Sequence, residues 1–355
     1  HTFEWKVCAT VLCRTALDEE SGRGRRLAVN RRESGGTVSR PSLRERITGG
    51  LWGSIVGDAL GVPVEFQNRD FLDSNPVTGL MGYGTHMQPA GTWSDDSSML
   101  LCTAESLLEE GYCPSDMMER FSLWLSTGKW TPRGVVFDVG STTLASIKRY
   151  DSGLKVEQWG SSGERDNGNG SLMRMLPFCC FAHKWKLGEF IDGCFEISSL
   201  THAHIRAKLC CAYFGLVVKK LLEDVPIVEA VKFASRSIVS YVPEDEKKVL
   251  SSLLDCSVLH RERQEIDSSG YVRDCLEASL WCNHRYEGFE EAVLAAVNLG
   301  QDCDTTASVT GGLAGIIHGV GAIRDDWVFG LARCDDLARL IEPFVDKAIA
   351  EEELI

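Results

Sequence analysis

The sequence predicts an all-α protein. Apolar residues recur at the three-to-four-residue spacing of amphipathic helices through most of the chain, whereas alternating strand patterns and β-branched clusters are scarce. No Asn-Gly turn joins two alternating segments, so a β-hairpin is not expected. With 355 residues, 44% of them hydrophobic, the chain can bury a sizeable core. We therefore expect one large helical domain over residues 46–355.

Glycine and proline residues mark the ends of several predicted helices. A helix that starts near residue 97 ends at Gly111, and the next one starts at Pro114. Further apolar faces at helical spacing cover residues 289–297 and 309–320. The run 205–222 is apolar on nearly all sides, which is typical of a helix at the centre of a bundle.

The first 45 residues differ in charge from the rest of the chain. Residues 1–46 contain 10 Lys and Arg against 6 Asp and Glu, a surplus of +4, so the remainder carries −18 and the whole chain −14. This segment is rich in Ser and Gly and has no sustained helical pattern. We expect residues 1–45 to be a basic, disordered leader outside the folded domain.

Charge, hydropathy and cysteine spacing exclude several classes of protein. The net charge of −14 argues against binding to a nucleic-acid backbone. No apolar run approaches the ~18 residues that a membrane helix requires. The 14 cysteines form no C-x-x-C motif, and the adjacent pairs Cys179–Cys180 and Cys210–Cys211 lie in apolar helical runs. We therefore expect reduced core cysteines in a cytoplasmic protein.

Two acidic clusters at predicted helix starts carry the strongest chemical signal. The first is Trp-Ser-Asp-Asp-Ser (93–97), and the second is Gln-Asp-Cys-Asp-Thr-Thr (301–306). Helix capping accounts for about one acidic residue in each cluster. The surplus carboxylates repel one another unless a cation compensates, and Mg²⁺ or Mn²⁺ prefers carboxylate and hydroxyl oxygens. Ordinary capping and binding of divalent ions are the two interpretations.

Three further segments carry weaker signals. Small residues every four positions over residues 53–61 predict a helix that packs closely on another, ends near Pro63 and is followed by Glu65. Turns rich in Gly or Ser at 166–177 and 137–143 are each expected to open a helix, where free N–H groups suit phosphate. The plainer interpretations are an exposed Glu after a helix crossing and flexible loops that end in helix caps.

Six short motifs follow one another along the chain. They are G-D-A-L-G-x-P-x-E-F (57–66), G-T-W-S-D-D-S (91–97), G-N-G-S-L-M-R (168–174), T-H-A-H (201–204), S-G-Y-V-R-D-C-L-E-A-S-L-W (269–281) and A-V-N-L-G-Q-D-C-D-T (296–305). In this order they resemble the ADP-ribosylglycohydrolase family, in particular its bacterial members related to the dinitrogenase-reductase-activating glycohydrolase. The resemblance implies a single orthogonal bundle of roughly a dozen helices around a binuclear metal site.

The resemblance also implies roles for individual residues. The ligands of two Mg²⁺ or Mn²⁺ ions would be Ser94, Asp95, Asp96, Asp302, Asp304 and Thr305. The catalytic carboxylates would be Glu65, Asp95 and Asp302, of which the first would be mobile and activate water or exchange with substrate. ADP-ribose would be bound by Gly140, Ser141, Thr142, Asn169, Gly170 and Ser171 at the diphosphate, His202 at the ribose and Tyr271 at the adenine. Position 94 departs from the family pattern, which commonly has Thr there, but both hydroxyls can bind a metal ion.

The reaction implied by the resemblance is hydrolysis of the bond between C1″ of ADP-ribose and a modified side chain, with arginine as the first choice. The expected partner is an ADP-ribosylated protein or an ADP-ribose-containing small molecule, and the expected state is a monomer. Two other functions remain open. One is a non-catalytic ADP-ribose-binding or structural protein on the same scaffold, and the other is a di-metal phosphohydrolase that acts on nucleotides.

Overall fold

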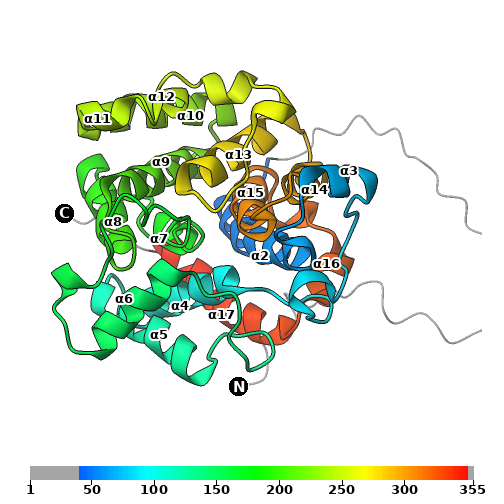
Figure 1. Cartoon of the computed structure of the whole chain (residues 1–355), viewed down its shortest axis with the longest axis horizontal. Helices are drawn as coiled ribbons and strands as arrows, with labels where there is room; N and C mark the ends of the chain where they lie inside the picture. The colour runs from blue at the N-terminus through cyan, green and yellow to red at the C-terminus, as the bar shows by residue number, and fades with distance from the viewer. Residues whose placement is uncertain (1–39, 351–355) are drawn as a thin grey trace, which may run out of the picture. The chain divides into compact units, whose positions relative to one another are not determined.

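The computed structural model describes residues 40–350, and its regular structure in this range is helical, with sixteen α-helices and no β-strand (Figure 1). The α-helices are α2 (Leu43–Gly61), α3 (Arg69–Ser74), α4 (Asp95–Glu110), α5 (Pro114–Thr127), α6 (Ser141–Asp151), α7 (Leu176–Phe181), α8 (Leu187–Ser199), α9 (Ile205–Leu222), α10 (Ile227–Ile238), α11 (Glu244–Lys247), α12 (Ser251–Leu254), α13 (Val272–Arg285), α14 (Phe289–Val297), α15 (Cys303–His318), α16 (Asp325–Gly330) and α17 (Cys334–Ala350). The 3₁₀ turns η1 (Val62–Val64) and η2 (Gly84–His86) follow α2 and α3. The all-α prediction is confirmed. Over residues 40–350, the helices are too short or too polar to cross a membrane.

Most helix ends predicted from glycine and proline agree with the structure. Gly111 is the C-cap of α4, and Pro114 is the first residue of α5. The glycine-rich segment 166–177 is an exception, because α7 starts only near its end. A separate turn precedes that helix and is closed by the N–H of Leu172, which donates to the carbonyl oxygen of Asn169 at 2.8 Å. The N–H groups of this segment therefore belong to a turn and not to the first turn of a helix.

The folded part of the chain starts slightly earlier than predicted. Ser42 caps α2: its hydroxyl accepts from the N–H of Glu45 at 3.3 Å, and its own N–H donates to the Glu45 carboxylate at 2.7 Å. The compact helical unit begins at Pro41. Residues 41–45 thus belong to the helical unit, whereas residues 1–39 of the predicted leader lie outside the described part of the chain.

The centre of the fold is a close antiparallel crossing of α2 and α15 (Figure 1). Small residues line the contact, with Gly49 against the backbone of Gly315 and Gly53 against that of Gly311. A methyl group at Gly53 would overlap the carbonyl oxygen of Gly311. Because interiors are already close-packed, no larger residue fits there unless the two helices separate. The closely packing helix predicted over residues 53–61 is confirmed.

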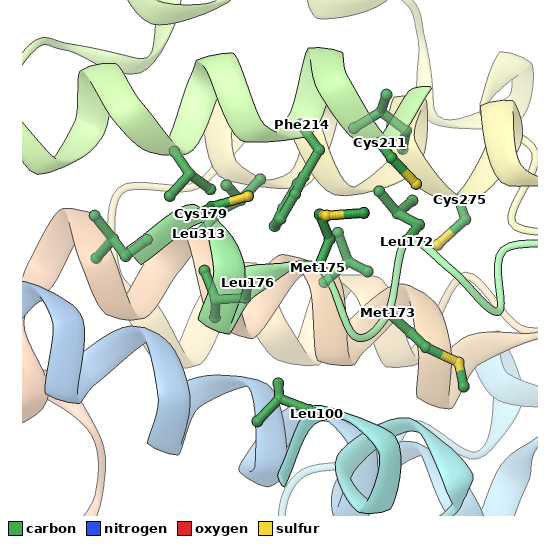
Figure 2. Close-up of a cluster of buried hydrophobic side chains, with 14 of the residues drawn as sticks. Leu100, Leu172, Met173, Met175, Leu176, Cys179, Cys211, Phe214, Cys275 and Leu313 are labelled. Carbon is green, nitrogen blue, oxygen red and sulfur yellow. The ribbon is translucent and has the colours of Figure 1, made fainter. Parts of the chain in front are cut away.

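Other helices surround the central pair and complete the hydrophobic core. α13 and α14 pack on α15, while α4, α7 and α17 pack on α2. Figure 2 shows Phe214 of α9 pointing towards Met175, in the segment that leads into α7, and Leu313 of α15 in the same cluster. All twelve cysteines in the described part of the chain are free thiols, and nine of them are buried, as predicted for core residues.

We expect Gly53→Ala to destabilise the protein by about 3 kcal/mol, because the added methyl group must push two packed backbones apart. The matched control is Gly188→Ala in α8, where an added methyl group meets no atom and favours the helix by up to about 1 kcal/mol. Unfolding in urea measures both changes. Equal stability of the two variants would contradict the close crossing.

Candidate active site

The helix crossing places the end of α2 beside the start of α15. Gly61, the last residue of α2, packs against the backbone of Asp304 in the first turn of α15. The chain then turns through η1 to Glu65, whose side chain is buried. Carboxylate oxygens of Glu65, Asp302 and Asp304 all lie within 4.8 Å of one another. The last turns of one helix and the first turn of another thus form one acidic cluster.

Asp58, one turn before the end of α2, fixes the start of α4. Its buried carboxylate accepts hydrogen bonds from the N–H groups of Ser94 and Ser97, each at 3.0 Å, and from Ser97 Oγ at 2.5 Å. Ser94 Oγ accepts from the N–H of Asp96 at 3.2 Å. These bonds satisfy N–H groups that a helix start leaves without partners. The capping of α4 is therefore performed by Asp58 and Ser94, so capping does not account for the carboxylates of Asp95 and Asp96.

The two predicted acidic clusters meet at Asp96. Its Oδ2 accepts from Ser94 Oγ and from Thr305 Oγ1, both at 3.2 Å, so the start of α4 contacts the start of α15. The other oxygen of Asp96, Oδ1, and Oδ2 of Asp304 are buried without a hydrogen-bond partner in the described part of the chain. Burial of a carboxylate oxygen without a hydrogen-bond partner costs folding free energy. Such oxygens are good ligands for a divalent cation.

Glu65 also contacts residues from two loops. Its Oε2 pairs with His86 Nε2 in η2, and its carboxyl group is hydrogen-bonded to Asp138, which precedes α6. Thr85 Oγ1 donates to the backbone carbonyl of Glu65 at 2.7 Å. The side chains of Glu65, His86 and Asp138 form a second group whose ligand atoms lie within 4.8 Å of one another. Glu65 is the residue that this group shares with the acidic cluster.

Burial and mutual repulsion raise the pKa values of four carboxyl groups at this site. Burial, and then the neighbouring carboxylates, raise the pKa of Glu65 to about 10. Burial in the first place also holds the pKa values of Asp95, Asp96 and Asp304 well above their usual range, and nearby carboxylates add to the effect. Without a cation Glu65 therefore keeps its proton at neutral pH. Positive charge that enters the cluster lowers these pKa values and favours release of that proton.

Most of the residues predicted to bind ADP-ribose lie around one glycine-rich turn. A Cβ added at Gly170 would lie 3.0 Å from both Thr143 Oγ1 and His202 Cε1. Thr143 belongs to the first turn of α6, which Gly140 precedes and Ser141 and Thr142 open. The turn around Gly170, the start of α6 and His202 are therefore neighbours.

Asn169 joins this turn to the acidic cluster, whereas Ser171 lies in the core. Asn169 Nδ2 donates to Asp302 Oδ2 at 2.9 Å. The hydroxyl of Ser171 is buried and lies 3.0 Å from Ser198 Oγ and 3.3 Å from Cys211 Sγ. The side chain of Ser171 therefore lies in the protein interior.

Tyr271 lies at the other side of the same turn. The backbone of Tyr271 forms an isolated antiparallel bridge with that of Gly168. The half-buried ring of Tyr271 contacts two guanidinium groups. These belong to Arg273, 5.3 Å from the ring centroid, and Arg206, 5.8 Å away. An aromatic ring flanked by cations is a surface on which a further planar group can stack.

Sequence reasoning missed three residues of the site, Asp58, His86 and Asp138. Asp58 could have been predicted from the sequence. It lies in a helix predicted to pack closely on another, and a buried acidic side chain needs hydrogen-bond partners. Asp138 lies within the turn 137–143, for which the sequence predicts a role only for the N–H groups. His86 lies in an irregular segment between α3 and α4 where neither periodicity nor motif spacing points to it.

Fold and site together define a helical protein in which carboxylates from separate elements converge where divalent cations fit. The family model for ADP-ribosylglycohydrolase matches residues 39–353. The chain therefore belongs to the ADP-ribosylglycohydrolase family, and the resemblance inferred from the six motifs is confirmed.

Characterised members of the family are similar to this chain over most of its length. The ADP-ribosylarginine hydrolase Tri1 of Serratia proteamaculans is 31% identical over 312 residues, which cover 87% of this chain and 81% of that protein. The ADP-ribosyl-[dinitrogen reductase] glycohydrolase of Rhodospirillum rubrum is 29% identical over 301 residues, 81% of this chain and 90% of that protein. A solved ADP-ribosylglycohydrolase-related protein complex matches with a TM-score of 0.72 at 27% identity, over 86% of this chain and 99% of that chain.

We expect the metal-free protein to lose stability as the pH rises from about 7 to about 8. The folded state keeps a proton on Glu65, with a pKa of about 10, whereas the unfolded chain has released it near pH 4. Buried His202, with a pKa of about 3, acts in the opposite direction only below about pH 6.5, where the unfolded chain gains a proton on it. Above pH 7 the unfolded state therefore binds fewer protons, and Glu65 lowers the free energy of unfolding by up to about 1.4 kcal/mol per pH unit. Urea unfolding of chelator-treated protein across this range, with Glu65→Gln as the comparison, measures the slope. A stability that stays level or rises would contradict the raised pKa values.

Proposed function

We propose that this chain removes ADP-ribose from a modified arginine side chain by attack of water at C1″ of the ribose, with two Mg²⁺ or Mn²⁺ ions bound. The observation that carries the proposal is the convergence of buried carboxylates from the end of α2 and the starts of α4 and α15, with two of their oxygens unpartnered among the described residues. The named activities of the Serratia and Rhodospirillum relatives support the choice of substrate.

The residues present fit the proposed ions. The proposed ligands are Ser94, Asp95, Asp96, Asp302, Asp304 and Thr305. They offer carboxylate and hydroxyl oxygens, which are the donors that Mg²⁺ and Mn²⁺ prefer. Asp96 Oδ1 and Asp304 Oδ2 have no competing hydrogen bond to a described residue. When bound, two such ions polarise a substrate oxygen and help to ionise a water molecule.

Glu65 is the proposed general base. With a pKa of about 10 it is protonated while the cluster lacks a cation, and positive charge nearby lowers the pKa of a carboxyl group. Glu65 therefore becomes able to accept the proton of the attacking water only when cationic groups are present. Asp95 and Asp302 provide negative charge that stabilises the oxocarbenium character of a glycosidic transition state.

The neighbouring turns supply a binding surface for ADP-ribose. In this proposal the diphosphate lies against residues 140–142 and the turn at Asn169 and Gly170, His202 donates to the ligand, and Tyr271 stacks on the adenine. Support comes from the geometry, since the start of α6, the Gly170 turn and His202 are neighbours. Asn169, which donates to Asp302, ties that surface to the acidic cluster and so orients the ribose towards Glu65.

Arginine suits this site better than serine as the modified residue. A protonated guanidinium departs as a neutral guanidine, so the reaction needs no separate proton donor, whereas a serine alkoxide needs one. The carboxyl groups of Glu65 and Asp138 lie together beside the cluster and attract a cationic group. Both features favour a substrate that carries its own positive charge.

We expect Asp304→Ala to lower the rate of ADP-ribose release by orders of magnitude, because it removes a proposed metal ligand and misplaces the attacking water. The substrate is a peptide with ADP-ribosylated arginine, and free ADP-ribose is measured with and without a chelator. Asp326→Ala is the control, since that side chain is exposed and pairs with Arg324 on the surface. Undiminished activity after exhaustive chelation would remove the metal from the mechanism, and release of AMP in place of ADP-ribose would identify a phosphohydrolase.

We expect Glu65→Gln to keep the affinity for ADP-ribose while it lowers turnover about 10²–10⁴-fold, the usual cost of losing a general base. The amide has the size of the carboxyl group but cannot accept the proton of water. Calorimetric binding of ADP-ribose and single-turnover cleavage of the arginine-linked substrate separate the two effects, with the exposed Glu290→Gln as a matched control. Cleavage near the wild-type rate would make Glu65 a bystander and shift the search for the base to Asp95 or Asp302.

A further inference from the structure

His202 engages one ring nitrogen inside the protein and turns the other towards the glycine-rich turn. The residue is 2% exposed, and its Nδ1 lies 2.8 Å from Thr201 Oγ1. Its Nε2 makes no hydrogen bond to a described residue. A Cβ at Gly168 or Gly170 would lie 3.6 or 3.5 Å from Nε2, so any larger side chain would cover it. The two glycines leave this nitrogen accessible from the proposed ADP-ribose surface.

Arg174 determines the direction of the hydrogen bond between Thr201 and His202. Arg174 is fully buried, and its Nη2 donates to Thr201 Oγ1 at 2.8 Å and to the carbonyl of Ile197 at 3.1 Å. A guanidinium group has donors and no acceptor, so the threonine oxygen must accept in that bond. Its own hydrogen then needs an acceptor, and within the described residues His202 Nδ1 is the acceptor at hydrogen-bond distance.

We propose that Arg174 and Thr201 form a relay that holds His202 as its Nε2–H tautomer, so that this N–H donates to an oxygen of ADP-ribose. A neutral imidazole has one donor and one acceptor nitrogen, so an accepting Nδ1 leaves Nε2 as the donor. Arg174 and Thr201 are positioning residues, which act through His202 without touching the ligand. The identity of the ligand rests on the proposed function, whereas the relay rests on hydrogen bonds within the chain.

The surroundings of Arg174 support this role. No carboxylate lies at salt-bridge distance among the described residues, and its Nε and Nη1 have no hydrogen bond there. Its guanidinium lies 4.7 Å above the ring of Phe121. A buried cation without an anionic partner is costly, so packing alone does not account for it. Burial, and then the charge of Arg174, hold the pKa of His202 at about 3, which keeps the imidazole neutral as the relay requires.

Four hydrogen bonds hold the backbone of residues 201 and 202 in place independently of the relay. The N–H of His202 donates to the carbonyl of Ser198 at 2.8 Å, and Ser198 Oγ donates to the carbonyl of His202 at 3.0 Å. The carbonyl of Thr201 accepts from the N–H of Ser161 at 2.9 Å and from Ser146 Oγ at 3.0 Å. Loss of the Thr201 hydroxyl therefore leaves the backbone at His202 supported and removes the hydrogen bond that selects the tautomer of its ring.

The tautomer is measured directly by long-range ¹H–¹⁵N correlation spectra of the ¹⁵N-histidine-labelled full chain, with His202→Gln to assign the signal. We expect the wild-type spectrum to show a protonated Nε2 and an unprotonated Nδ1 at neutral pH. Thr201→Val should give a mixture of the two tautomers, because no hydroxyl then donates to Nδ1, and Thr201→Ser should restore the wild-type pattern. Thr103→Val, which also loses a buried hydroxyl and lies in α4, is the matched control and should leave the His202 signal unchanged.

Calorimetric binding of ADP-ribose to the same proteins tests the consequence for the ligand. Loss of one oriented donor should weaken binding by Thr201→Val about 2- to 10-fold, while Thr201→Ser and Thr103→Val bind like the wild type. A wild-type His202 with Nδ1–H overturns the relay even if no variant folds, and so does a Thr201→Val protein with unchanged tautomer and affinity. A wild-type protein that shows Nε2–H and does not bind ADP-ribose at all instead refutes the proposed function and the ligand assigned to this donor.

Discussion

The structure depends on the close approach of two helix backbones, α2 and α15. Their glycine-lined contact allows no side chain between them, so the end of one helix is held against the start of the other. Glu65 follows the first helix, and Asp302 and Asp304 open the second, so the approach that forms the centre of the core also brings the carboxylates together. A looser crossing would let the carboxylates move apart and regain water. The acidic cluster is therefore enforced by packing on a rigid pair of helices.

Two backbone hydrogen bonds also hold the segments that carry the acidic cluster together. The N–H of Phe66 donates to the carbonyl of Gln301 at 2.6 Å, and the N–H of Gln301 donates to the carbonyl of Gln67 at 2.7 Å. Phe66 and Gln301 both have a left-handed backbone, with φ of 64° and 59°. This conformation costs about 1 kcal/mol or more for a residue other than glycine, so the pair persists because its surroundings impose it. The residues that directly precede Asp302 and follow Glu65 are thus locked to one another.

Local features of the fold could be predicted from the sequence, whereas contacts between distant segments could not. Helices, their ends and the close crossing were predictable, because apolar spacing, Gly111 and Pro114, and the small residues of α2 act locally. The acidic clusters were recognisable because their carboxylates exceed what capping requires. The meeting of the two clusters at Asp96 was not predictable from spacing, since it depends on how α4 and α15 pack. His86 was missed for the same reason: its role arises from a contact between an irregular loop and Glu65.

Residues 268–272 connect the acidic cluster to the turn proposed to bind ADP-ribose. The carbonyl of Ser268 accepts from the N–H of Asp302 at 3.1 Å, and the carbonyl of Gly270 accepts from the N–H of Asn169 at 3.0 Å. The side chain of Asn169 then returns to Asp302, which closes a small ring of hydrogen bonds. The carboxylates rest on α2, α4 and α15, whereas the proposed binding surface rests on other elements. This short segment therefore holds the turn proposed to bind ADP-ribose against the acidic cluster.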